Sequence, residues 1–151
     1  MFKLSTKGRY GTRLMANLAR HYKDGHGTII LKNVAEEEGI SIRYLEQIII
    51  PLKIDKLVKS IRGAGGGYTL GRPPREIKLC DILRAMEGSC SLVECVEDPA
   101  SCDKVPLCGT HEVWKEATRL LKNYFDNTSL QDVLDIAEKK AAAAKKKGRM
   151  H

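Results

Sequence analysis

The chain has few aromatic residues and no long apolar run. Aromatic side chains make up 5% of its 151 residues, with a single tryptophan. This composition does not suggest a deep pocket for a large organic ligand, although 42% apolar residues can fill a modest core. No stretch approaches the ~18 apolar residues of a membrane span. The start, MFKLSTKGRYGTRL, also lacks the apolar segment of a secretory signal. We therefore expect a cytoplasmic protein without membrane contact.

Two common motifs are also missing. The five cysteines are an odd number and none of them form a CxxC pair, which disfavours both a disulfide framework and a typical structural zinc site. The one glycine-rich run, GAGGG at 63–67, lacks the GxxxxGK[ST] pattern, and no helix is predicted to begin straight after it. These features argue against a phosphate-binding loop.

Charge is distributed unevenly along the chain. Residues 1–80 carry 15 Lys/Arg against 7 Asp/Glu, a net +8, whereas residues 81–135 carry 5 against 11, a net −6. The last sixteen residues carry 6 against 1, a net +5. A basic first half followed by an acidic second half fits a DNA-facing module joined to a regulatory or dimerisation module.

The first sixty residues predict a helix-turn-helix. Ser5 or Thr6 can cap a helix that ends near His21, and a short helix before Gly39 follows. Ser41 then caps a third helix, SIRYLEQIII, which continues the helix, turn, helix pattern. Pro51 lies where this helix should continue, and we expect a kink or break there because proline removes a backbone donor.

A hairpin is predicted directly after the third helix. LVKSIR and YTLGR have the character of two short strands, and the GAGGG loop between them permits a tight turn. This places a two-stranded wing beside the helix-turn-helix.

The second half of the chain is predicted to be mainly helical. A fourth helix lies within 75–88, and residues 89–110 are loop-like. A long helix follows with a wide apolar stripe, for which a second copy of the chain is the simplest partner. The stripe consists of Val113, Trp114, Ala117, Leu120, Leu121 and Tyr124.

These elements give a mainly α fold with four parts. We expect a winged helix-turn-helix domain at 1–80, a helix and cluster-binding loop at 81–111, and a dimerisation helix with a following helix at 112–137. The basic, low-complexity end at 138–151 is expected to be disordered.

Three cysteines and a histidine crowd into seventeen residues of the predicted loop. Cys95, Cys102, Cys108 and His111 are separated by six, five and two residues. Structural zinc and a metal-free thiol switch are alternatives, but wide spacing in a loop favours an iron–sulfur cluster. A histidine ligand would raise the reduction potential and add a protonatable, more easily lost ligand, which suits a sensor. Cys80 is expected in the core, and Cys90 is a possible alternate ligand.

The segments STKGRYGTRLM, ISIRYLEQ, SIRGAGGGYTLGR and C-x6-C-x5-C-x2-H-x2-W closely resemble the bacterial iron–sulfur cluster regulator (IscR) family. The resemblance covers about residues 1–135. It implies a non-enzymatic, homodimeric winged-helix repressor of iron–sulfur assembly genes, bound to an imperfect palindrome in double-stranded DNA. It also implies that the cysteine–histidine set holds a [2Fe-2S] cluster, with [4Fe-4S] as the alternative.

The resemblance further implies which residues contact DNA. Glutamine pairs with adenine, glutamate accepts from cytosine, and arginine suits guanine or a narrow minor groove. The recognition-helix positions are Ser41, Arg43, Tyr44, Glu46 and Gln47, and the wing positions are Arg62, Gly65, Gly66 and Tyr68.

The chain departs from related subgroups in informative ways. Arg43 stands where enteric members have serine, and the first cysteine gap is one residue longer than theirs. A nitric-oxide-sensing subgroup uses an N-terminal aspartate as a cluster ligand, and the matching position here is Arg9, which cannot ligate iron. A cysteine-metabolism subgroup lacks the cysteine set. A nitric-oxide or redox-sensing repressor on this fold remains the alternative function, and a small electron carrier is a more distant one.

Overall fold

The computed structural model describes residues 3–150 and is mainly helical. The N-terminal module contains α1 (Thr6–Arg20), α2 (Leu31–Glu38), α3 (Ile42–Ile54) and a hairpin of β1 (Val58–Ile61) and β2 (Gly67–Leu70). The C-terminal half contains α4 (Leu79–Glu87), α5 (Glu94–Glu97), α6 (Gly109–Asp126) and α7 (Leu130–Arg149), with short 3-10 turns at Lys23–Gly25, Pro74–Glu76, Pro99–Ser101 and Val105–Leu107. The predicted winged helix-turn-helix fold is confirmed.

The helix ends follow the predicted capping residues. Ser5 and Ser41 precede α1 and α3, and each side chain accepts a hydrogen bond from a backbone N–H in the first turn. Gly39 ends α2 in the left-handed conformation, with φ of 65°. These caps set the sharp turn between α2 and α3 that defines the motif.

Pro51 does not break α3, so of the expected kink or break the break is wrong. The helix continues through it to Ile54. Proline inside a helix costs about 3 kcal/mol, but here it lies in the last turn and Leu52 beside it is fully buried. Burial of a leucine side chain contributes about 1.5–3 kcal/mol, which offsets most of the loss.

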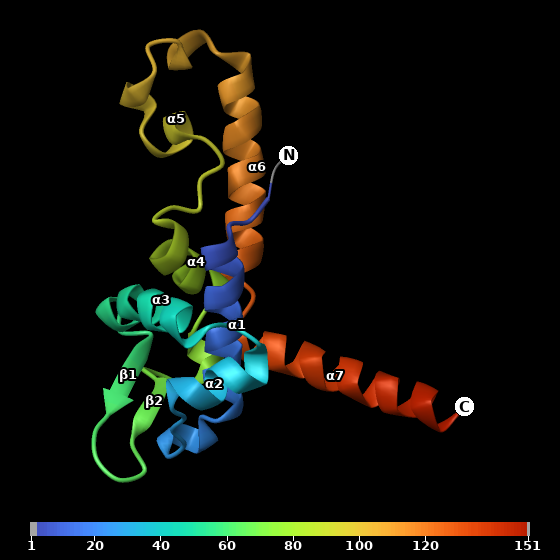
Figure 1. The fold of residues 1–151 in the computed structure, drawn as a ribbon. Coiled ribbons are helices and arrows are strands. Elements are labelled where there is room, and N and C mark those ends of the chain that lie inside the picture. Colours follow the sequence, from blue (N-terminus) through green and yellow to red (C-terminus); the bar gives the residue numbers. More distant parts are fainter. Residues whose placement is uncertain (1–2, 151) are drawn as a thin grey trace.

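The C-terminal tail is also different from the expectation. We expected residues 138–151 to be disordered, but α7 runs without interruption from Leu130 to Arg149. His151 lies outside the described residues. Alanine and lysine have high helix propensity, and Ser129 with Asp132 forms a capping box at the N-terminus of this helix. The helix projects away from the rest of the molecule (Figure 1).

One hydrophobic core holds the module together and extends beyond it. Leu14, Leu45 and Leu52 are fully buried at its centre. Ile77 and Ile82 join this core from around α4, and Leu130 joins it from the start of α7. The helix α4 packs against α1, α3 and α6. It therefore connects the N-terminal module to the upright helix α6 (Figure 1).

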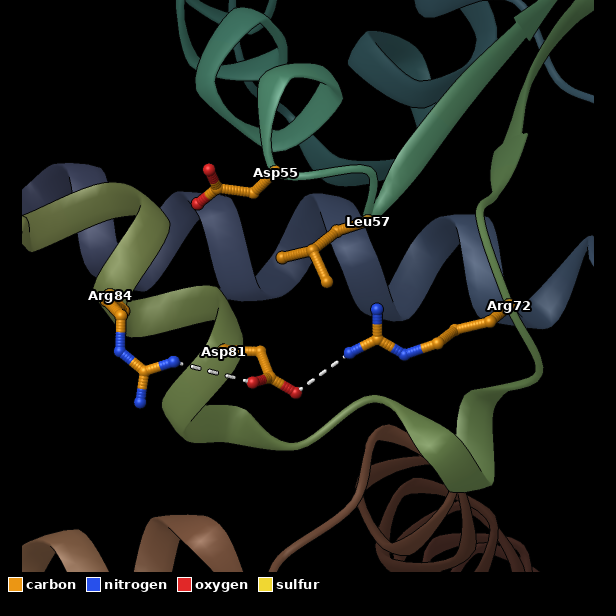
Figure 2. Close-up of a pocket in the computed structure, with 5 residues that line it drawn as sticks. All are labelled: Asp55, Leu57, Arg72, Asp81 and Arg84. Atoms are coloured by element: carbon orange, nitrogen blue, oxygen red, sulfur yellow. Dashed lines mark hydrogen bonds and ion pairs between the residues drawn. The ribbon is translucent and has the colours of Figure 1, made fainter.

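An ion-pair cluster ties the end of the wing to α4 (Figure 2). Asp81 accepts a hydrogen bond from Arg72 at 3.1 Å and lies 3.7 Å from an Arg84 nitrogen. The same residues, with Asp55 and Leu57, line a cavity of about 310 Å³. Asp81 contacts both guanidinium groups, and its bond to Arg72 joins the segment after the wing to α4.

Candidate nucleic-acid interface and metal centre

The polar face of α3 is free in the described residues. Ser41, Arg43, Glu46 and Gln47 are exposed, while Leu45 between them is fully buried. The helix is thus anchored by its apolar side and presents the predicted base-reading side chains outward. This is the arrangement that a helix entering the major groove requires.

Tyr44 has a structural contact as well. It is half-buried and packs edge-on against Tyr10 of α1, with ring centroids 5.7 Å apart. The guanidinium groups of Arg9 and Arg13 lie over the Tyr10 ring at 5.6 and 5.5 Å. Tyr44 therefore helps to fix α3 on α1, and a contact to DNA stays a prediction.

The wing is built by its glycines. Gly65 has a φ of 73°, and its carbonyl accepts a hydrogen bond from the Thr28 hydroxyl at 2.7 Å. A Cβ on Gly66 would overlap the Ile61 carbonyl oxygen. The two glycines are required by the tight turn. Arg62 is exposed at the base of this turn, and its contact with DNA stays a prediction.

Tyr68 anchors the wing to the module. Its backbone exchanges two hydrogen bonds with Ile29, at 3.0 and 2.8 Å. The Lys53 ammonium group lies 5.9 Å from the centre of its ring. Tyr68 is half-buried, so its backbone and ring join wing, α3 and the segment before α2.

Two of the four predicted cluster ligands lie together. Nδ1 of His111, in the first turn of α6, is 3.4 Å from Sγ of Cys95 in α5. His111 is only 5% exposed. Because the two residues come from separate helices, their contact joins α5 to α6 at the far end of the molecule (Figure 1).

The other two ligands lie apart from this pair. Cys102 is exposed, and the thiol of Cys108 contacts the Thr110 hydroxyl at 3.2 Å. Hydrogen bonds from that hydroxyl and from the His111 backbone N–H lower the pKa of Cys108, which favours the thiolate form that binds metal. Among residues 3–150, no three His, Cys, Asp or Glu side chains form a closed metal site.

All four predicted ligands have donor atoms that suit an iron–sulfur cluster, but only Cys95 and His111 lie close enough to share one. Three thiolates, which are soft ligands, and one imidazole, which also binds iron, are the donor types that iron–sulfur clusters use. Cys102 and Cys108 lie on a loop of short turns that contributes no residue to the hydrophobic core. Their positions are therefore not fixed by packing, whereas that of His111 is.

Sequence reasoning did not foresee the contact of the remaining two cysteines. Cys80 is fully buried, as expected, but its Sγ lies 3.3 Å from Sγ of Cys90. No pattern in the sequence marks this pair, since ten positions and a glycine turn separate the two residues. Whether Cys90 is an alternate ligand stays a prediction.

Part of the predicted apolar stripe of α6 is exposed, whereas Leu121 is half-buried and lines a cavity together with Leu83 of α4. Val113, Leu120 and Tyr124 are 58%, 56% and 63% exposed, and Trp114 is 44% exposed. Large apolar side chains on one face of a helix mark an interaction surface. No helix among residues 3–150 is long and apolar enough to cross a membrane.

Comparison with known proteins identifies the family. The model of the Rrf2 family, described as an iron-dependent transcriptional regulator, matches residues 4–136. The chain belongs to the Rrf2 family. Members are named as transcriptional regulators, so the protein is a DNA-binding regulator and not an enzyme.

Individual relatives within the family have two different names. The regulator CymR of Bacillus subtilis is 41% identical over 136 residues, covering 90% of this chain and 92% of CymR. The regulator IscR of Xenorhabdus nematophila is 33% identical over 143 residues, covering 91% of this chain and 85% of IscR. Both comparisons span nearly the whole chain.

Solved structures give the same two names. The structure of CymR, described as the global cysteine regulator of B. subtilis, matches with a TM-score of 0.74 and 40% identity, covering 90% of this chain and 98% of that one. IscR from T. potens matches with a TM-score of 0.75 and 40% identity, covering 92% and 90%. The resemblance to IscR-type regulators is confirmed, and the similarity to CymR is equally close in structure.

Proposed function

We propose that this protein is a dimeric, cytoplasmic transcriptional regulator whose DNA binding responds to an iron–sulfur cluster, and that it represses iron–sulfur assembly genes. The observation that carries the proposal is the buried contact of His111 with Cys95. A buried histidine can be an ordinary core residue. Here, however, its ring contacts a thiol, and two more cysteines lie in the loop that ends at the same helix. A shared metal centre accounts for all four residues.

Cys95, Cys102, Cys108 and His111 would hold the cluster. When bound, a cluster supplies a redox-active, oxidant-sensitive centre. The residues themselves do the rest: His111 and Cys95 link α5 to α6, and Cys102 and Cys108 would draw the exposed loop onto that link. We favour a two-iron cluster because an imidazole completes the set and Arg9 replaces the aspartate of the four-iron subgroup.

The route from this site to DNA runs through α6. The loop is attached to α6 where the Thr118 hydroxyl accepts a hydrogen bond from the Leu92 N–H at 3.2 Å. The helix α6 in turn packs on α4, and α4 packs on α1 and α3. The exposed apolar stripe of α6 supports pairing with a second copy. A change in the loop would then alter how far apart two α3 helices lie, which decides whether both fit one palindromic operator.

An iron and sulfide count after anaerobic purification tests the proposal. We expect two irons and two sulfides per chain and visible absorption, both lost in Cys95→Ala, Cys102→Ala and Cys108→Ala. The Cys90→Ala variant is the matched control and should keep the cluster. Analytical ultracentrifugation should give a dimer for every variant. Visible absorption that survives in all three cysteine variants would contradict the ligand assignment, and four irons per chain would favour the nitric-oxide-sensing alternative.

A second candidate is a regulator that responds to cysteine metabolism. It is favoured by the 41% identity to CymR, against 33% to the IscR of X. nematophila. This candidate predicts a colourless protein whose DNA affinity is the same with and without Cys95, Cys102 and Cys108. The absorption spectrum and a DNA titration of the Cys95→Ala variant therefore separate the two.

A further inference from the structure

A pair of thiols outside the proposed metal centre has the spacing of a disulfide precursor. Cys80 lies on α4 and Cys90 lies two residues after Gly88, which ends that helix. Their sulfurs are 3.3 Å apart. A disulfide bond is about 2.05 Å long, so the sulfurs need to approach by little more than about 1 Å.

The two thiols differ in their access to reagents. Cys90 is half-buried and lines an open cavity of about 450 Å³. This cavity lies between the N-terminal segment, α4 and α6, and its lining includes Leu4, Leu83, Leu92, Leu121 and Phe125. Cys80 is fully buried. A small reagent that enters the cavity therefore meets Cys90 first.

Cys80 is protected from contact with reagents by its burial, and it is also protected from direct oxidation. Burial, the neighbouring Cys90 thiol and the carboxylate of Asp126 raise the pKa of Cys80 to about 12. A thiol with a raised pKa stays protonated near neutral pH and does not attack an oxidant by itself. Its role is restricted to reacting with an already activated sulfur at close range.

We propose that Cys80 and Cys90 form a reversible disulfide, which makes this pair a redox modification site separate from the metal centre. The oxidant is a hydroperoxide small enough to enter the cavity. The Cys90 thiolate attacks one peroxide oxygen, the O–O bond breaks, and an alcohol leaves after protonation. The resulting Cys90 sulfenic acid is attacked by the Cys80 sulfur. As the S–S bond forms and the S–O bond breaks, the departing hydroxide takes the Cys80 proton, so this thiol is deprotonated only in that step and water leaves. Two thiols lose two electrons, and one peroxide is reduced to alcohol and water.

The disulfide would fix the first part of the loop. Leu92 is already held on α6 through Thr118. A bond between Cys90 and Cys80 adds a covalent attachment to α4 two residues earlier. Residues 90–92 would then be attached to both helices that link the metal centre to the DNA-facing module. The inference does not depend on the cluster, because it uses none of Cys95, Cys102, Cys108 and His111.

The test uses the full-length chain with three substitutions, Cys95→Ala, Cys102→Ala and Cys108→Ala. Cys80 and Cys90 are then the only cysteines. The count of titratable thiols in denaturant should fall from two to zero per chain after treatment with tert-butyl hydroperoxide. Dithiothreitol should restore both thiols. In the unmodified chain, digestion with trypsin and Glu-C should give a peptide LCDILR (79–84) cross-linked to GSCSLVE (88–94).

The matched control is Cys90→Ser in the same background. Its single buried Cys80 should keep its thiol through the same treatment. This variant changes only a half-buried position, so it remains informative if a substitution of Cys80 prevents folding. Persistence of both thiols, oxidation of Cys90 that stops at the sulfinic acid, cross-linked dimers on a non-reducing gel, or a link from Cys90 to Cys95 would each overturn the proposal. If the protein turns out to bind no iron–sulfur cluster, the expected thiol counts and cross-linked peptide stay the same.

Discussion

The DNA-facing module and the loop at 89–108 are organised on opposite principles. Leu14, Leu45 and Leu52 of the module are fully buried, whereas Leu107 of the loop is 97% exposed. The module is fixed by apolar burial before it meets DNA. The loop has one short helix, α5, two 3-10 turns and a few hydrogen bonds. Under the proposed function, its final arrangement depends on what its cysteines bind, and the module reads DNA while the loop responds to the ligand.

Replacing one leucine by alanine in each region gives the largest expected difference in stability loss. Leu45→Ala should destabilise the protein by about 2–5 kcal/mol, because it removes a fully buried side chain and leaves a cavity. Leu107→Ala should change stability by less than about 0.5 kcal/mol, as expected for an exposed position. Urea denaturation followed by circular dichroism measures both. Equal losses would mean that the loop is packed in solution as tightly as the module.

Gln47→Ala should separate DNA reading from folding. Loss of a bidentate base contact costs about 1–3 kcal/mol of discrimination, while Gln47 is exposed and its removal leaves the core unchanged. Fluorescence anisotropy at fixed salt should show weaker binding to an operator selected from random DNA. Binding to a scrambled duplex should stay the same, because non-specific binding comes from phosphate contacts. A uniform loss on both duplexes would remove Gln47 from the set of base-reading residues.

Ser129→Ala tests whether α7 belongs with the module. Its hydroxyl accepts a hydrogen bond from the Asp132 N–H at 3.1 Å, and Leu130 beside it is fully buried in the common core. Removal of such a cap costs about 0.5–2 kcal/mol. We expect a single unfolding transition at lower urea. A separate transition at lower urea, seen only in the helical circular dichroism signal, would show that α7 unfolds independently of the module.

The smallest expected effect is the pH response of the contact between α1 and α2. Burial raises the pKa of Glu38, but hydrogen bonds from Asn17 and Arg20 outweigh it, and the net pKa lies below the ordinary value of 4.5. A carboxyl group with a lowered folded pKa stabilises the fold fully above its unfolded pKa. This contribution is lost as the pH falls from about 4.5 towards the folded value.

Unfolding measured between pH 7 and pH 3 should therefore show a loss of stability that is smaller in Glu38→Gln. The variant has no carboxyl group to protonate at this position, and it should already be less stable at pH 7. An identical acid slope in both proteins would show that Glu38 contributes nothing to the response.

The sequence predicted the module well because its signals are local. Ser5, Ser41 and Gly39 act through their nearest backbone neighbours, so their capping roles were visible without tertiary structure. The outcome at Pro51 could not be foreseen in this way, since the continuation of α3 depends on burial of Leu52 against distant elements. Disorder of the tail was inferred from low complexity, but the alanine and lysine content that caused this inference is also helix-forming.

The candidate site was predictable in composition but not in arrangement. The ordered set of three cysteines and His111 was evident from spacing. No local pattern specifies where α5 and the start of α6 meet. This meeting point decides that His111 contacts Cys95 while Cys102 is exposed. The proximity of Cys80 and Cys90 likewise depends on the turn at Gly88.

Trp114 has a practical consequence for spectroscopy. It is the only tryptophan in the chain, and it lies on the exposed stripe of α6, one turn from His111. All tryptophan emission therefore comes from one place, on the proposed pairing surface and close to the proposed metal centre. Burial by a second copy would shift that emission to shorter wavelength, and a nearby coloured centre would quench it. The protein thus carries a built-in optical reporter that can follow assembly and metal loading in the same sample.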